Sequence, residues 1–152
     1  MNPLGQVSSI RRGRALSIIL ILLILATIGT LIYVIAAPKV GERFTEFYIL
    51  GPEGRAENYP SNVVLGEEVR VILGIVNRES EELSYRVVVN IDEVKSNEIG
   101  PVVLANDEKW EQEVSFIPTR VGENQKVAFV LYKQGQEEPY RTLRLWIDVK
   151  GR

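Results

Sequence analysis

The 152-residue chain contains no cysteine and no histidine. The lack of cysteine excludes disulfides and thiol chemistry, and the lack of histidine removes the commonest metal ligand and the usual general base at neutral pH. The chain also has no Ser-x-x-Lys motif, so its serines lack the lysine partner of one common class of nucleophilic enzyme. We therefore predict that the protein is not an enzyme and carries no metal and no cofactor.

The carboxylates give no pattern of a metal site. A calcium site needs about six to eight converging oxygen ligands, and no group of acidic residues has the loop spacing to supply them. We interpret the adjacent acidic pairs as solvated turn charges, with calcium binding or paired-acid chemistry as the alternative; the pairs are Glu81 and Glu82, Asp92 and Glu93, and Asp107 and Glu108. All 20 acidic residues follow residue 37, and this negative balance disfavours a nucleic-acid partner.

The chain does contain one long apolar run without a charged side chain, from Ala15 to Ala37. At about 1.5 Å per residue a helix of this length would measure about 34 Å, enough to cross a hydrocarbon core of about 30 Å. A cleavable signal has only about 7–15 apolar residues, and a cut after Ala37 would place Pro38 beside the bond. We predict a retained helix in the lipid bilayer, with a cleaved signal as the alternative.

Basic residues flank this run on both sides, Arg11, Arg12 and Arg14 before it and Lys39 and Arg43 after it. Basic residues near a span stay on the cytoplasmic side, and the first cluster is the tighter one. A twin-arginine export signal is the rival interpretation, although such signals usually have weaker apolar segments. The expected organisation at the cell membrane is a cytoplasmic tail (1–14) that is irregular over residues 1–9, a transmembrane helix (15–37), a linker (38–42) and an extracytoplasmic domain (43–152).

Beyond the linker, apolar residues alternate with polar ones at period two, which is typical of strands with one buried face. The clearest run buries Leu83, Tyr85, Val87, Val89 and Ile91 on one face. Further strands are expected at 43–50, 69–77, 110–116, 126–133 and 142–149, with a short one at 101–105 and turns between them, including one at 96–101. The sequence thus predicts an all-β, immunoglobulin-like antiparallel β-sandwich of about seven strands after a single transmembrane α-helix.

Two stretches resemble a known family. The order in FTEFYILGPEGRAENYP (44–60) and VVLGEEVRVILGIVNRE (63–79) is an aromatic strand ending in Leu-Gly-Pro, a Tyr-Pro turn, a Gly-Glu turn and a strand ending in Val-Asn. This order is similar to that of a prokaryotic membrane-protein family known as domain of unknown function sixteen-sixteen. SFIPTRVGENQKVAFVLYK (115–133) also resembles immunoglobulin-like bacterial surface domains. The resemblance implies a membrane-tethered sandwich of archaeal or bacterial origin, and no reaction or functional residue.

The aromatic residues suggest a contact surface. Trp146 falls between Leu145 and Ile147, so the alternation that buries these two residues turns the indole outward. Tyr132 is expected to face outward on the preceding strand, which would place both rings in one patch where Arg144 stacks on Trp146. An exposed aromatic group with charged neighbours often marks a binding surface. The alternative is that the ring packs under a neighbouring strand or turn.

Trp110 differs, because it shares a face with Val114 and Phe116 and is expected to point into the core. Together these features predict a non-enzymatic binding or tethering module for a protein partner at the cell envelope. Two alternatives remain open: an accessory structural subunit of a larger membrane complex, and a carbohydrate-binding module for envelope glycans.

Overall fold

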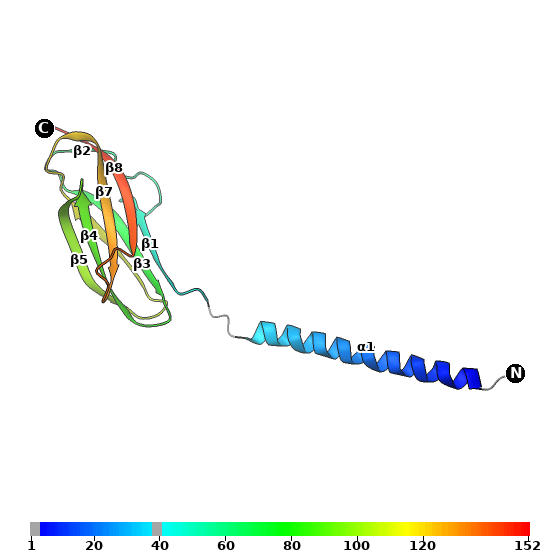
Figure 1. The fold of residues 1–152 in the computed structure, drawn as a ribbon. Coiled ribbons are helices and arrows are strands. Elements are labelled where there is room, and N and C mark those ends of the chain that lie inside the picture. Colours follow the sequence, from blue (N-terminus) through cyan, green and yellow to red (C-terminus); the bar gives the residue numbers. More distant parts are fainter. Residues whose placement is uncertain (1–3, 38–40) are drawn as a thin grey trace. The chain divides into compact units, whose positions relative to one another are not determined.

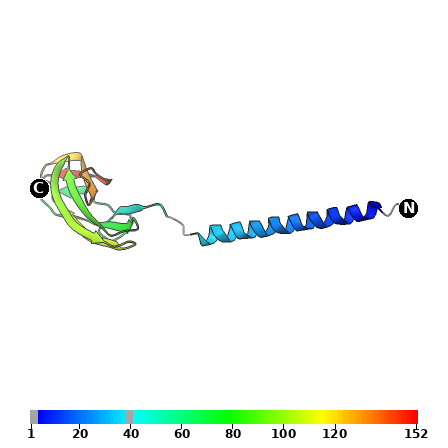
Figure 2. The same ribbon diagram turned by 60° about the horizontal axis from the view of Figure 1, so that its bottom comes forward.

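The computed structural model describes the backbone of residues 4–37 and 41–152, and the surroundings of side chains from residue 12 onward within these ranges. The chain divides into two units, Met1–Gly41 and Glu42–Arg152. The first is a single helix and the second is a β-sandwich (Figure 1 and Figure 2). Most of the predicted linker, residues 38–40, lies outside the described residues.

Helix α1 runs from Leu4 to Ala36. It therefore begins well before the apolar run, and the expectation of an irregular segment is wrong for residues 4–9. The physical reason is that no proline interrupts the chain between Pro3 and Pro38, so a helix seeded in the apolar run extends back through the basic residues.

The part of α1 from Arg12 to Ala36 is long and apolar enough to cross a membrane, and no residue in its most apolar stretch is buried. Hydroxyl groups in this part are satisfied within the helix. Those of Ser17, Thr27 and Thr30 each donate to a carbonyl oxygen one turn earlier, at 3.0, 2.8 and 2.8 Å. Internal satisfaction of polar groups is what a hydrocarbon environment requires.

Eight strands make up the second unit: β1 (Phe44–Leu50), β2 (Asn62–Val64), β3 (Val69–Arg78), β4 (Leu83–Ile91), β5 (Val94–Leu104), β6 (Lys109–Phe116), β7 (Gly122–Lys133) and β8 (Arg141–Lys150). They form a three-stranded sheet of order β1-β3-β6 and a five-stranded sheet of order β2-β8-β7-β4-β5 (Figure 1). Neighbouring strands are antiparallel except for β2 and β8, which are parallel. The predicted all-β, immunoglobulin-like sandwich is confirmed.

The expected turn at 96–101 is wrong, because these residues lie within β5. β5 is an edge strand, where the missing amide of Pro101 need not break a ladder of hydrogen bonds. The chain reverses between β4 and β5 at Asp92 and Glu93 instead, both of which have positive φ angles, 46° and 69°. Two such residues are typical of a tight hairpin.

The core lies between the two sheets and follows the predicted alternation. Tyr85, Val87, Val89 and Ile91 are all buried on the inner face of β4, which confirms the register expected for that strand. Trp110 is partly buried and packs against the core, as expected for an inward-facing ring.

Candidate binding surface

The outer face of the five-stranded sheet has an apolar centre with a polar border. Val88 of β4 lies opposite Val130 of β7, and Ala128 of β7 lies opposite Arg144 of β8. The three apolar side chains are only 7–8% exposed, although no second sheet covers this face in the described part of the chain. The longer side chains around them therefore shield them, as extended charged side chains commonly do.

Trp146 stands at one side of this face and is 55% exposed, so the expectation that the indole faces outward is confirmed. It lies opposite Lys126 across the β7–β8 ladder. Beside it is a hollow of about 180 Å³, lined by Asn90, Glu93, Lys126, Ala128, Val130, Thr142 and Arg144.

The two cations of this hollow differ in their partners. Lys126 is paired with Glu93, with Nζ 2.7 Å from the carboxylate oxygen. Arg144 has no ion-pair partner among the described residues. The guanidinium group of Arg144 is therefore available to a negatively charged group from another molecule.

Tyr132 does not join this group. Lys126, the residue opposite Trp146, precedes Tyr132 by six positions on β7, a separation of about 20 Å at about 3.3 Å per residue. The expectation of one patch that contains Trp146 and Tyr132 is therefore wrong. The expected stacking of Arg144 on Trp146 is also not found among the described residues; the arginine that lies over an aromatic ring on this face is Arg86, 4.5 Å from the centre of Tyr132.

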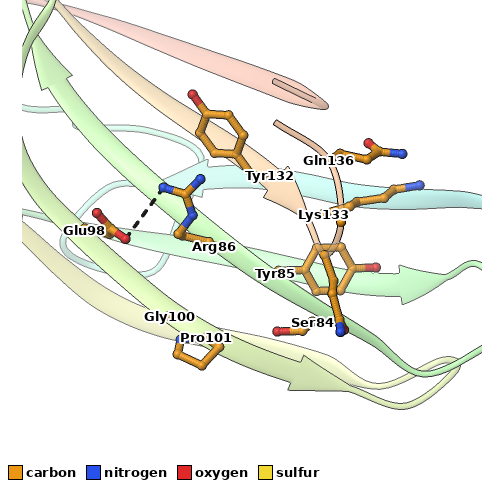
Figure 3. A pocket seen from close by; sticks show the side chains of 11 residues that line it. Ser84, Tyr85, Arg86, Glu98, Gly100, Pro101, Tyr132, Lys133 and Gln136 are labelled. Carbon is orange, nitrogen blue, oxygen red and sulfur yellow. Dashed lines mark ion pairs between the residues drawn. The ribbon is translucent and has the colours of Figure 1, made fainter. Parts of the chain in front are cut away.

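Arg86 and Tyr132 border a second hollow, of about 320 Å³, over β4, β5 and β7 (Figure 3). Figure 3 shows Arg86 between the ring of Tyr132 and the carboxylate of Glu98, which is 3.6 Å from the guanidinium. Gly100 forms part of the wall. Its φ angle is 127°, and a Cβ atom there would lie 2.9 Å from the carbonyl oxygen of Tyr85. Because Arg86 is already neutralised, this hollow is less suited than the other to an anionic group.

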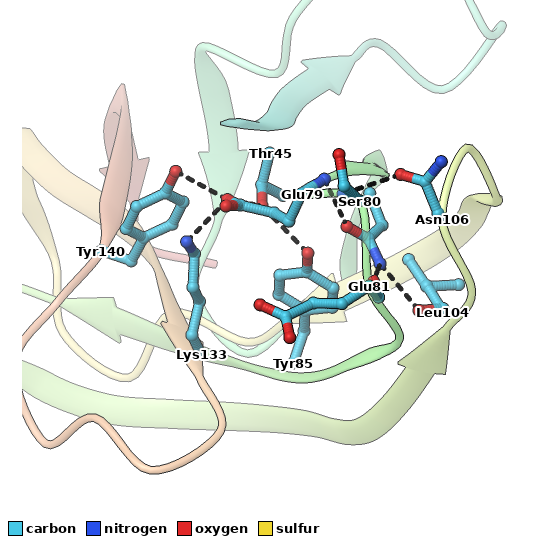
Figure 4. A network of polar contacts seen from close by, with 10 residues as sticks. Thr45, Glu79, Ser80, Glu81, Tyr85, Leu104, Asn106, Lys133 and Tyr140 are labelled. Carbon is cyan, nitrogen blue, oxygen red and sulfur yellow. Dashed lines mark hydrogen bonds and ion pairs between the residues drawn. The ribbon is translucent and has the colours of Figure 1, made fainter. Parts of the chain in front are cut away.

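A buried polar cluster joins the two sheets (Figure 4), and two of its residues, Tyr85 and Lys133, also line the second hollow. The carboxylate of Glu79 accepts hydrogen bonds from the hydroxyl of Thr45 at 2.8 Å and from that of Tyr140 at 3.0 Å, and it pairs with Lys133 at 2.6 Å. Since Thr45 donates its proton to Glu79, it accepts from the hydroxyl of Tyr85, 2.9 Å away. No side-chain polar atom buried in the described residues lacks a partner. The cluster is thus a closed structural network rather than an open site.

Two of the adjacent acidic pairs of the sequence, Asp92 with Glu93 and Asp107 with Glu108, make hydrogen bonds and ion pairs at turns. Asp92 accepts a hydrogen bond from the Lys126 amide, and Asp107 is 3.1 Å from Arg78. Within the described ranges, no three acidic side chains converge in a way that could hold a metal ion.

Sequence reasoning did not identify Arg86 or Glu98. Each is a single charged residue in an alternating strand, and only the pairing of β4 with β5 and β7 brings them to Tyr132. No local signal distinguishes them from other outward charges.

Comparison with known proteins identifies the family of the chain and solved structures with a similar fold. The model of the family described as "Domain of unknown function (DUF1616)" matches residues 38–148. No curated protein matches the chain. Among solved structures, the CARDB domain of the PF1109 protein from Pyrococcus furiosus, solved in complex with di-metal ions, is similar with a TM-score of 0.51 and 14% identity. The match covers 70% of this chain and 93% of that one.

A chain from the complex of Zinc 2-glycoprotein and Prolactin inducible protein from human seminal plasma is similar with a TM-score of 0.50 and 11% identity. The match covers 74% of this chain and 99% of that one. At these identities the likeness concerns the fold alone. Its second unit has an immunoglobulin-like fold similar to that of the CARDB domain and follows an apolar helix, and the chain belongs to the DUF1616 family, whose function is unknown.

Proposed function

We propose that the protein is a single-pass membrane protein that displays its immunoglobulin-like domain outside the cell and binds a protein partner at the cell envelope, without catalysing a reaction. The observation that carries the proposal is the exposed Trp146 beside Arg144, which has no ion-pair partner in the described residues. Tryptophan and arginine are the residue types most enriched among those that dominate binding energy at protein interfaces.

The helix supports the membrane part of the proposal. Large apolar side chains of α1 are 48–73% exposed from Leu16 to Ile35, and they lie on all sides of the helix. Exposing so much apolar surface to water would be strongly unfavourable, whereas a lipid bilayer would cover it.

Tethering would make a weak contact sufficient. Confinement of two partners to one membrane raises their effective concentration, so a small surface around Trp146 could hold a partner that it would not retain in free solution. The Pyrococcus furiosus domain was solved with di-metal ions. Our proposal includes no metal, because residues 41–152 bring together no set of acidic ligands for one.

Site-specific photo-crosslinking of the full-length chain in cells that produce it naturally tests the proposal. A benzophenone amino acid at Trp146 should crosslink to one protein. The matched control is the same amino acid at Glu113, which is also exposed but lies on the three-stranded sheet. Equal crosslinking from both positions, or none from Trp146, would contradict the proposal.

Two other measurements separate the alternatives. A partner that remains bound at fixed stoichiometry through purification in detergent would favour an accessory subunit of a membrane complex. A carbohydrate-binding module is favoured by the exposed indole alone, since aromatic faces stack on sugars; binding of the full-length protein to envelope glycans on an array, lost in Trp146→Ala, would support it.

A further inference from the structure

Strand β8 has an edge that is only partly paired. On one side it pairs with β7 from Arg141 to Val149. On the other side it pairs with β2 at only three positions, Asp148 to Lys150. Within the described residues, the first part of β8 therefore has no strand beside it on this edge.

The direction of the backbone groups follows from the contacts with the β2 segment. The amide of Asp148 donates to the carbonyl oxygen of Ser61 at 2.7 Å, and the carbonyl oxygen of Lys150 accepts from Leu65 at 2.9 Å. In an antiparallel ladder, alternate residues direct their N–H and C=O groups to opposite edges. The N–H and C=O groups of Thr142, Arg144 and Trp146 thus point to the open edge.

This edge borders a groove. A hollow of about 480 Å³ lies between β8 and β1, lined by Phe44, Thr45, Glu46, Phe47, Tyr48, Arg141, Thr142 and Leu143. Figure 1 shows the two strands next to each other at one side of the sandwich. Phe47 and Leu143 are half-buried and pack against the core, and Phe44 is 38% exposed. The inner wall of the groove is therefore apolar.

The side of the groove formed by β8 is basic. Arg141 lines the groove, and Arg144 lies next to it along β8 and lines the hollow on the outer face. Both arginines are exposed, and neither has an ion-pair partner among residues 41–152. Glu46, the acidic residue of the lining, is already paired with Arg78 at 2.5 Å. If a strand were added beside β8, its outward-facing side chains would lie next to those of Arg144 and Trp146. Because opposite charges on neighbouring strands attract, acidic residues are favoured at these outward-facing positions of the added strand.

We propose that the open edge of β8 takes an extended acidic and apolar segment of a partner protein by strand addition. The segment pairs its backbone with Thr142, Arg144 and Trp146, inserts alternate apolar side chains between Phe47 and Leu143, and turns its acidic side chains toward Arg144. A second copy of this chain fits less well, because pairing β8 with itself about Arg144 would oppose like charges. The inference rests on the proposed function and names the chemistry of the partner.

Hydrogen exchange measured by NMR on the full-length chain in lipid nanodiscs tests strand addition. The probe is a capped heptapeptide of alternating glutamate and valine. Its binding should slow the exchange of the Thr142, Arg144 and Trp146 amides by at least about tenfold, the change expected when an open amide enters a ladder. The amides of Leu143 and Leu145, which face β7, should change little. Binding that leaves the first three amides unprotected would overturn the inference.

Charge variants test the role of Arg144. Arg144→Glu should weaken binding of the glutamate peptide by about tenfold, since an attractive cross-strand pair becomes a repulsive one, and should strengthen binding of the corresponding lysine and valine peptide. Arg120→Glu makes the same charge change in an exposed loop outside the groove and should alter neither affinity. Equal effects of the two variants would overturn the inference.

Two further outcomes also overturn strand addition by a partner. If the three amides are already protected without peptide, the edge is not open; protection that rises with protein concentration would identify a second copy as the occupant. If photo-crosslinking from Trp146 captures a partner that leaves these amides unprotected, strand addition is wrong while the proposed function stands. Failure of that crosslinking contradicts the proposed function, whatever the peptide does.

Discussion

Lys133 lies 2.6 Å from Glu79, and the two side chains are only 13% and 9% exposed. The pair joins the end of β7 to the residue that follows β3, one strand from each sheet. The hydroxyl of Tyr140, which donates to the same carboxylate, comes just before β8. The cluster thus fixes the point at which β8 begins, and with it the position of the open edge.

Breaking this ion pair should destabilise the domain strongly. Lys133→Met would leave the carboxylate of Glu79 buried without its cation, and loss of one partner of a buried pair costs about 3–5 kcal/mol. Chemical denaturation of the full-length protein, followed by tryptophan fluorescence, measures the change.

Two comparisons show whether the cost comes from the unpaired charge. The double variant Glu79→Gln, Lys133→Met should be more stable than Lys133→Met alone, because no charge is left unpaired. Arg55→Ala removes one side of an ion pair whose side chains are 73% and 56% exposed, and should leave the midpoint unchanged. Equal losses in the single and double variants would show that packing, not charge, is responsible.

The stability of the domain should also fall in acid, because Glu79 becomes protonated. Burial by itself would raise the pKa of Glu79, but the hydrogen bonds from Lys133, Thr45 and Tyr140 together with the charge of Lys133 hold this pKa below its ordinary value of 4.5. A carboxylate with a depressed folded-state pKa stabilises the fold above its unfolded-state pKa, and the contribution is lost as the pH falls through the folded-state value.

Thermal unfolding between pH 6 and pH 3 checks this expectation. The midpoint should begin to fall near pH 4.5, and the fall should be shallower in Glu79→Gln, which has no proton to gain. Exposed glutamates with depressed pKa values, such as Glu68 and Glu93, add to the fall in both proteins, and high salt should reduce their share. Identical pH profiles for the two proteins would show that Glu79 does not contribute.

Truncation of a core side chain should have a large effect. Phe129 is fully buried, and its ring meets that of Phe116 edge to face, with 6.1 Å between the centroids. Phe129→Ala should therefore lower the free energy of unfolding by about 3–5 kcal/mol. An unchanged denaturant midpoint would contradict the register of β7.

Trp146→Ala, in contrast to Phe129→Ala, should weaken partner binding and leave stability nearly unchanged. Because the indole is 55% exposed, its removal should change the denaturation midpoint little. Capture of the partner should nevertheless weaken by about tenfold or more, as expected for a residue that dominates an interface. Trp146→Phe is the conservative control and should retain part of the affinity. A large loss of stability in Trp146→Ala would instead assign the indole a structural role.

Protease added to intact cells tests the orientation. We expect cleavage in residues 43–152 and protection of a tag placed before Met1, because basic residues near a span stay on the cytoplasmic side. A domain that is cleaved only after the cells are opened would reverse the orientation, and a domain released free of membranes would contradict the anchor.

The features that depend on near neighbours along the chain can be predicted from the sequence. The apolar composition of residues 15–37 predicts the helix, and the alternation around Val87, Val89 and Trp146 predicts which side chains face the core and which face out. These signals are local, because the side-chain periods of helices and strands repeat every few residues. The start of the helix at Leu4 was missed because the residues before the apolar run carry no period of their own.

Which outward-facing residues come together depends on how the strands pair. The order and register of the strands separate Trp146 from Tyr132, bring Arg86 to that ring, and pair Glu79 with Lys133. They also leave β8 open beyond its short pairing with β2, and they give Pro101 a place in an edge strand. These features arise from contacts between segments far apart in the chain, and a shift of one residue in register would turn each side chain to the other face.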